Sequence, residues 1–186
     1  MKLDGKSYRI PAPSADRKRF NLAAWTLEAW VNPAVSGESG SLIRYEGTYY
    51  TNLQSQAINF YELGLKAGVP YVKMETTSKQ TYTAAQVTVG ALPAGEWTHV
   101  AGVFDPDNNA LTLYANGIAL ASVQVLEAGL AASVTADTFP GKAFIGGAGL
   151  TGNIDEVRIW KSARTADEIA YGIQNLIAAG DKRLVC

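Results

Sequence analysis

Apolar and polar residues alternate along most of the chain with a period of two, which is the pattern of strands that bury one face. The clearest case is residues 25–32, where one face holds Trp25, Leu27, Ala29 and Val31, and the other Thr26, Glu28, Trp30 and Asn32. Similar runs predict strands at 7–10, 41–46, 57–63, 71–77, 97–104, 111–115, 118–125, 143–146 and 153–160. Such spacing predicts an all-β, two-sheet antiparallel sandwich. Because simple hairpins would leave long open edges, we expect jelly-roll or Greek-key crossings.

The end of the chain has helical instead of strand periodicity. Thr165 and Glu168 have the spacing of a capping box, and apolar residues recur on one helical face from Ile169 onwards. Gly180 follows as a stop signal. We expect this helix to pack outside the sandwich. The prediction is a single domain over residues 1–186, with the sandwich at about 3–161 and the helix at about 165–179.

The composition is that of a folded protein, with 47% apolar and 18% charged residues. A net charge of -1 argues against nucleic acid as a partner, because nucleic-acid binding needs a basic patch. The chain has no run of 18 uncharged apolar residues, so we expect no membrane insertion. Residues 1–5 have no apolar segment of the kind found in signal peptides, and the pattern alone leaves the compartment open.

The chain has one cysteine and one histidine, Cys186 and His99. A disulfide within the chain and a zinc site built from Cys and His are therefore both excluded. The thiol of Cys186 is either free or paired with another chain. His99 lies in the middle of a predicted strand with no nucleophile pattern beside it, so we expect a structural histidine, hydrogen-bonded near a sheet surface.

Asp155 is a charge within a run of apolar, strand-prone residues at 154–160. A carboxylate in a buried strand needs a partner, which is usually a cation or a set of backbone amides. This position is a candidate metal ligand for that reason.

Four motifs along the chain carry a family resemblance. They are residues 25–33 (WTLEAWVNP), 95–105 (GEWTHVAGVFD), 113–117 (LYANG) and 154–160 (IDEVRIW). In this order they resemble the laminin-G-like, concanavalin A-like lectin and glucanase domains, from about residue 3 to 170. The resemblance implies a jelly roll, and members of the group bind glycans, glycoconjugates or proteins, often at the cell surface and often with calcium.

The resemblance also implies a place for a calcium ion. In similar jelly rolls the first and last strands lie side by side, and an ion can join them. Asp4, Gly5 and Asp155 would supply carboxylate and carbonyl oxygens. Lys6 and Ser7 stand where many members carry an acidic pair. In the alternative, Asp155 accepts hydrogen bonds from N-terminal amides without a metal.

Tyrosines are frequent in the middle of the chain, at Tyr45, Tyr49, Tyr50, Tyr61, Tyr71 and Tyr82. Sugars stack their C–H faces on aromatic rings, and amide side chains read their hydroxyls. Residues 49–52 have the character of a loop tip, so Tyr49, Tyr50, Asn52 and Gln54 are candidate ligand-binding residues. In the alternative, most of these tyrosines pack against the sheets.

A glycan-cleaving enzyme is disfavoured, because such enzymes need two carboxylates facing one cleft. Adjacent strand residues such as Asp155 and Glu156 point to opposite faces, and no alternating string of acids occurs. We therefore expect a non-catalytic binding module, or lectin, for a glycan or glycoprotein ligand. The alternative is a structural or adhesion protein that uses the sandwich for protein contacts, including assembly as a homo-oligomer.

Overall fold

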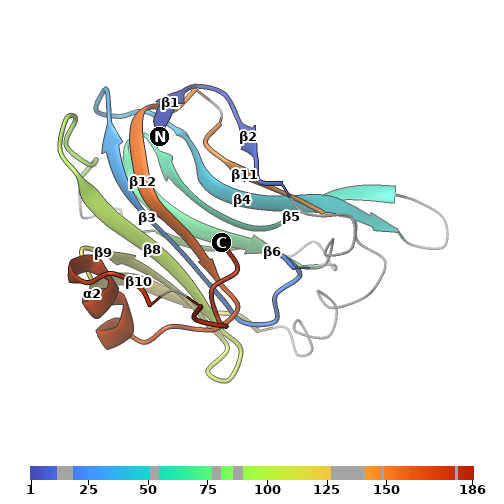
Figure 1. The fold of residues 1–186 in the computed structure, drawn as a ribbon. Coiled ribbons are helices and arrows are strands. Elements are labelled where there is room, and N and C mark those ends of the chain that lie inside the picture. The colour runs from blue at the N-terminus through green and yellow to red at the C-terminus, as the bar shows by residue number, and fades with distance from the viewer. Residues whose placement is uncertain are drawn as a thin grey trace.

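Two six-stranded antiparallel sheets face each other in the protein (Figure 1). The computed structural model describes residues 1–11, 19–50, 55–76, 81–85, 90–126, 141–147, 149–178 and 180–186, with the backbone alone at 48–50, 55–57 and 85. Sheet A has the order β1 (Lys2–Asp4), β12 (Thr151–Trp160), β3 (Trp25–Pro33), β8 (Thr98–Asp105), β9 (Ala110–Ala115) and β10 (Ile118–Gln124). Sheet B has the order β2 (Tyr8–Arg9), β11 (Lys142–Ile145), β4 (Gly40–Tyr50), β5 (Ser55–Lys66), β6 (Val69–Glu75) and β7 (Thr81–Ala85).

The chain crosses from one sheet to the other several times, as the strand orders show. For example, β3 in sheet A is followed by β4 in sheet B, and β7 in sheet B is followed by β8 in sheet A. These crossings confirm the jelly-roll sandwich that the alternating pattern predicts. Each of the ten predicted strands has a counterpart, although β4 and β5 extend well beyond residues 41–46 and 57–63. The pattern missed β1 and β7 as strands.

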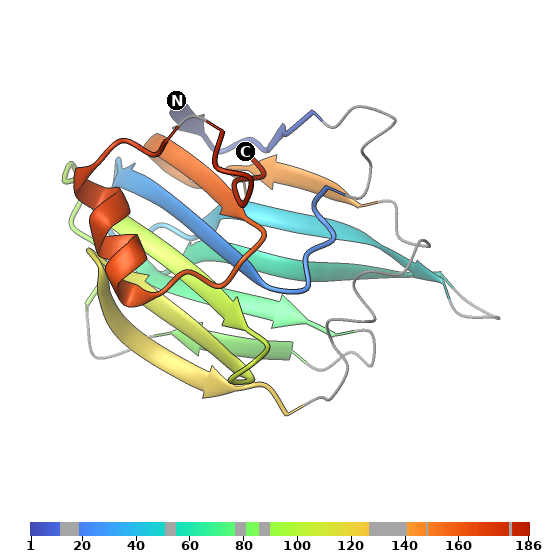
Figure 2. The same cartoon turned by 60° about the horizontal axis from the view of Figure 1, so that its bottom comes forward.

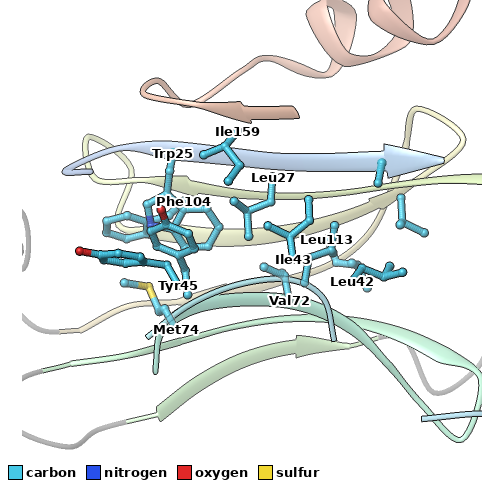
Figure 3. Close-up of a cluster of buried hydrophobic side chains, with 14 of the residues drawn as sticks. Trp25, Leu27, Leu42, Ile43, Tyr45, Val72, Met74, Phe104, Leu113 and Ile159 are labelled. Atoms are coloured by element: carbon cyan, nitrogen blue, oxygen red, sulfur yellow. The ribbon is translucent and has the colours of Figure 1, made fainter. Parts of the chain in front are cut away.

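The core lies between the two sheets (Figure 3). Sheet A contributes Trp25, Leu27, Phe104, Leu113 and Ile159, and sheet B contributes Ile43, Tyr45, Val72 and Met74. At one end the aromatic rings pack together, with the Trp25 ring centroid 5.1 Å from that of Tyr61. A glycine at position 102 is needed for the close approach of the sheets, because a Cβ there would overlap the side chain of Val72.

One helix, α2 (Ala166–Gln174), lies across the outside of sheet A (Figure 2). The predicted capping box is confirmed, because the Glu168 amide donates to Thr165 Oγ1 at 3.2 Å and the Thr165 amide donates to Glu168 Oε2 at 3.0 Å. Ile169 packs on Ala101 and Val103 of β8. The helix ends at Gln174, earlier than the predicted residue 179, because Asn175 is already extended and Leu176 is 90% exposed with nothing to pack against.

The end of the chain returns to sheet A beside β12. The amide of Ile159 donates to the carbonyl of Cys186 at 2.8 Å, and the amide of Val185 donates to the carbonyl of Ile159 at 2.7 Å. Cys186 is partly buried against the core, and burial raises the pKa of its thiol. Across the described ranges, no helix has the length and hydropathy that a bilayer span requires.

Candidate functional site

A hollow of about 720 Å³ lies on sheet B, across β4, β5, β6 and β7. The period-two alternation places Leu63 and Val72 in the core, so their neighbours Glu62, Tyr71 and Lys73 are on the face turned away from sheet A. The lining residues that the structure describes are Ser39, Gly40, Ser41, Glu62, Leu65, Lys66, Ala67, Val69, Tyr71, Lys73 and Thr83. We call this feature the sheet B hollow.

Glu62 is the centre of the polar network in the sheet B hollow. Its Oε1 accepts hydrogen bonds from the hydroxyls of Ser41 and Tyr71, the latter at 2.6 Å. Its Oε2 accepts from Asn59 Nδ2 at 2.6 Å and pairs with Lys73 Nζ at 2.8 Å. Burial alone would raise the pKa of Glu62, but the donors Lys73, Ser41 and Tyr71 outweigh burial and lower it. Glu62 is therefore an ionised carboxylate that fixes its neighbours in place.

The ring of Tyr71 lies over Gly64, the residue opposite it on β5. A Cβ at position 64 would stand 2.8 Å from the Tyr71 hydroxyl and 2.7 Å from the carbonyl oxygen of Gly40, so only glycine leaves this space free. Burial, and then the bond to Glu62, raise the pKa of Tyr71, so its hydroxyl keeps its proton. The Tyr71 ring is thus held in one orientation beside the ammonium group of Lys73.

A second group of charges lies on the outer face of sheet A, where α2 lies across the sheet, and its residues are buried (Figure 2). The Oε1 atom of Glu28, which has no exposed surface, accepts from Trp160 Nε1 at 2.7 Å and Arg164 Nη1 at 3.0 Å. Arg158 Nη1 donates more weakly to the same atom at 3.4 Å. These bonds tie β3, β12 and the segment before α2 together, so we assign this cluster to structure and not to ligand binding.

His99 belongs to this buried cluster, and the expectation that it lies hydrogen-bonded near a sheet surface is wrong. It has no exposed surface, and neither ring nitrogen has a hydrogen-bond partner among the described residues. Burial, and then the charges of Arg158 and Arg164, lower its pKa to about 4. His99 is therefore neutral at pH 7, and its 3.6 Å contact with Glu28 is not an ion pair.

Asp155 is exposed, so the prediction of a charge inside a buried run is also wrong. Asp155 pairs with Trp30 of β3 and alternates with the buried Ile154, so it lies on the outer face of sheet A. A bulge between Asp155 and Arg158 follows it, and Glu156 within that bulge is exposed as well. Asp155 Oδ1 accepts a hydrogen bond from the next amide, that of Glu156, at 2.9 Å. The buried charge of this strand is Arg158 instead.

The first and last strands lie side by side, as the family resemblance implies, because β1 pairs with β12. The pairing places Asp4 opposite Thr151, and the Gly5 carbonyl accepts from the Gly149 amide at 3.3 Å. Asp155 lies four residues further along β12, a distance of about 13 Å at the usual rise of a strand. The register therefore does not bring Asp4, Gly5 and Asp155 into one coordination sphere.

The surroundings of Asp4 fit a calcium ion poorly as well. The ammonium group of Lys6 is 3.4 Å from Asp4 Oδ2, so a cation already accompanies this carboxylate. Among the described residues no group of three or more Asp, Glu, His or Cys side chains converges as a metal site. Calcium binding stays a prediction.

Of the predicted ligand residues, Tyr49 and Tyr50 are at the far end of sheet B. Asn52 and Gln54 lie outside the described residues, and Tyr49 and Tyr50 are described by their backbone, as the last residues of β4. That tip projects from the sandwich in Figure 1. It is ten residues along β4 from Gly40 in the sheet B hollow, or about 33 Å at the rise of a strand. The hollow and the predicted tip are therefore separate places.

Sequence reasoning missed the pairing of Glu62 with Lys73 and Ser41. All three residues lie in or beside predicted strands, and Tyr71 was among the tyrosines considered for sugar stacking. The missing information was the register, because β4 pairs with β5 through two irregularities, at residues 41–43 and 45–46. The sequence signal that could have indicated this site is a polar residue at every second position of neighbouring strands.

The two antiparallel sheets, between which the chain crosses several times, and the helix outside sheet A form a concanavalin A-like sandwich. The chain belongs to the concanavalin A-like lectin/glucanases superfamily, whose laminin-G model matches residues 4–170. A comparison with curated proteins gives no match.

Solved structures share the fold at low sequence identity. The CBM40 of a Ruminococcus gnavus IT-sialidase, bound to α2,3-sialyllactose, has a TM-score of 0.68 at 16% identity, covering 94% of this chain and 96% of that one. Domain 4 of AbnA, a GH43 extracellular arabinanase from Geobacillus stearothermophilus in complex with arabinotriose, has a TM-score of 0.61 at 20% identity, covering 91% and 73%. A heptameric SAP-like pentraxin from Limulus polyphemus has a TM-score of 0.57 at 14% identity, covering 80% and 69%.

Proposed function

We propose that the protein is a non-catalytic carbohydrate-binding module and that it holds its ligand in the sheet B hollow. The observation that carries the proposal is the Tyr71 ring, fixed over Gly64 by its bond to Glu62 at the floor of an open hollow. A ring held in place in the free protein loses little conformational freedom on binding, which favours affinity.

The lining of the hollow suits a sugar because it combines two kinds of surface. Ala67 and Val69 supply apolar wall on one side, and Lys73 and Thr83 supply polar groups on the other. A sugar ring has an apolar C–H face and a rim of hydroxyls, so it needs both kinds of contact at once.

The chemistry of Glu62 supports binding without catalysis. It is the one carboxylate among the described lining residues, whereas glycoside hydrolysis uses two. Its lowered pKa keeps it ionised, so it cannot donate a proton as a general acid near neutral pH. Its oxygens are engaged by Ser41, Tyr71, Asn59 and Lys73, so it is also a poor base or nucleophile.

The similar structures lend support at the level of the ligand class. The Ruminococcus gnavus module is bound to sialyllactose and the arabinanase domain to arabinotriose, so sandwiches of this shape accommodate oligosaccharides. A non-catalytic role in glycan binding is consistent with both.

A glycan array tests the proposal, followed by titration of the best ligand with the Tyr71→Ala variant. We expect at least one oligosaccharide to bind, and the Tyr71→Ala variant to lose about tenfold or more in affinity, since a stacked aromatic ring contributes on the order of 1–3 kcal/mol. Tyr171→Ala, on the exposed face of α2, is the matched control and should bind as the wild type does. Wild-type affinity in the Tyr71→Ala variant would remove the sheet B hollow from the proposal.

Assembly through an edge strand is a second candidate function, and β10 favours it. This strand ends sheet A, its seven residues carry no charge and no proline, and Ile118 is 68% exposed. An edge without charges can pair with another strand. Light scattering should then give a mass above 19.8 kDa that returns to the monomer in the variant Ala119→Lys, at an exposed position of β10. A monomer at all concentrations would contradict this candidate.

A further inference from the structure

We infer that the sheet B hollow selects acidic sugars, those that carry a carboxylate or sulfate group, over neutral ones. This inference rests on the proposed function and names the ligand class of the same site. It follows from counting which hydrogen-bonding groups of the hollow are engaged within the protein and which remain free for a ligand.

The one carboxylate among the described lining residues, that of Glu62, is fully engaged. The two oxygens of a carboxylate offer about four lone-pair positions. Glu62 accepts from Ser41 and Tyr71 on one oxygen and from Asn59 and Lys73 on the other, so its positions are filled. Sugar hydroxyls act mainly as donors toward carboxylates, and the single carboxylate in this lining has no position left for them.

Two of the neutral donors are engaged as well. The hydroxyls of Ser41 and Tyr71 each have one hydrogen, and both give it to Glu62. The lowered pKa of Glu62 and the raised pKa of Tyr71 agree with this arrangement of protons. These two side chains can still contact a ligand through the ring of Tyr71 and through oxygen lone pairs.

The free groups are mainly cationic donors. The ammonium group of Lys73 has three N–H donors, and one of them is directed at Glu62. Lys66, at the end of β5, is exposed and has no acidic partner among the described residues. With Glu62, Lys66 and Lys73 as the charged lining residues, the hollow has one positive charge in excess.

A ligand that matches this surplus brings acceptors and a negative charge. A carboxylate or sulfate group can accept from Lys73 or from Lys66, which the register places four residues apart along the hollow, and charge-assisted bonds of this kind are about twice as strong as neutral ones. The sugar ring that carries the group can then lie against Tyr71 and the apolar wall formed by Ala67 and Val69. A neutral sugar would gain the apolar contact but would bring no negative charge to balance the excess positive charge of the hollow.

The test uses the full chain and an array with neutral, uronate-containing, sialylated and sulfated oligosaccharides. We expect the strongest binders to be acidic. For the strongest of them, we expect loss of the acidic group to weaken binding about tenfold. An effect of carboxyl reduction identifies a carboxylate as the recognised group, and an effect of desulfation identifies a sulfate. Because the attraction is electrostatic, affinity should also fall as salt rises from 0.05 to about 0.5 M.

A variant of Lys66 and a matched control complete the test. Lys66→Gln removes one exposed charge without touching the Glu62 network, and we expect it to weaken the acidic ligand several-fold while leaving any neutral ligand unchanged. Lys161→Gln, an exposed lysine after β12, is the matched control and should have no effect. Circular dichroism verifies that both variants are folded.

Three results separate this inference from the proposed function. Acidic binders that weaken in Lys66→Gln support both. Neutral binders, or acidic binders indifferent to removal of the acidic group, overturn the inference and leave the carbohydrate-binding proposal standing. An array with no binder overturns both.

Discussion

At the scale of single residues, Glu28 is the side chain on which the outer face of sheet A depends. It is the shared acceptor of Arg158, Arg164 and Trp160, and it is fully buried. Glu28→Gln keeps the shape but leaves the buried Arg164 without its carboxylate partner and Arg158 with Glu156 alone. We expect it to lower the free energy of unfolding by about 3 kcal/mol, as for other broken buried pairs. Urea unfolding followed by circular dichroism measures this loss.

Glu156→Gln is the matched control for Glu28→Gln. Glu156 also pairs with Arg158, but from the exposed side of β12. Exposed pairs contribute about 0–1 kcal/mol, so the loss should be much smaller. If the two variants lost equal free energy of unfolding, the burial of Glu28 would not increase its contribution to stability.

His99 makes stability depend on pH. Its pKa is 6.5 in the unfolded chain and about 4 in the folded protein, so between these values the unfolded state binds the extra proton. Stability is therefore complete above about pH 6.5 and falls as the pH is lowered towards 4. Fully expressed, a shift of this size corresponds to about 3 kcal/mol. Urea unfolding at pH 7 and pH 4.5 measures the difference, and His99→Gln should make it smaller.

The contrast between Asp155 and Glu28 shows what sequence can predict about a residue. Alternation along residues 25–32 correctly assigned Glu28 to the polar face of its strand. Whether that face meets solvent depends on α2, which begins more than a hundred residues later and covers it. Asp155 was predicted as buried because its neighbours are apolar, but it alternates with the buried Ile154 and faces outwards opposite Trp30. The burial of Glu28 thus depends on a distant contact that no local pattern records, whereas the period of two could have placed Asp155 on the outer face.

At the scale of elements, the hollow depends on the pairing of β5 with β6. Gly64→Ala would place a methyl group against the Tyr71 hydroxyl and the Gly40 carbonyl. We expect the Tyr71 ring to move and glycan affinity to fall about tenfold or more. Calorimetric titration of the array's best ligand measures this. Gly90→Ala is the control, because a Cβ at position 90 meets no atom within 4 Å and its affinity should not change.

The strands could largely be predicted from sequence, whereas the site could not. Long strands such as β3 and β8 are readily predicted because each contains a continuous alternating or apolar run. β1 has three residues and β7 pairs with β6 alone, so both depend on neighbours more than on their own pattern. The sheet B hollow needs Ser41, Glu62 and Lys73 from three strands in one register, and that register is a property of the folded sheet.

At the scale of the whole molecule, the calcium hypothesis is decided by a thermal melt of metal-stripped protein with calcium and with EDTA. The hypothesis from sequence predicts a higher melting temperature with calcium, because a ligand that binds only the folded state stabilises it. It also predicts that Asp155→Ala abolishes the shift. A shift retained in Asp155→Ala but lost in Asp4→Ala would assign the ion to the β1 edge, and no shift at all would end the hypothesis.

The central claim is that the sheet B hollow is the glycan site, and an NMR titration of the ¹⁵N-labelled protein with the array's best ligand tests it most directly. We predict that the backbone amides that shift lie at Ser41, in residues 62–73 and at Thr83, around the hollow. Amides in α2 and along β12, on the far side of the sandwich, should stay in place. Shifts confined to residues 49–54 at the tip, or to α2, would contradict the account.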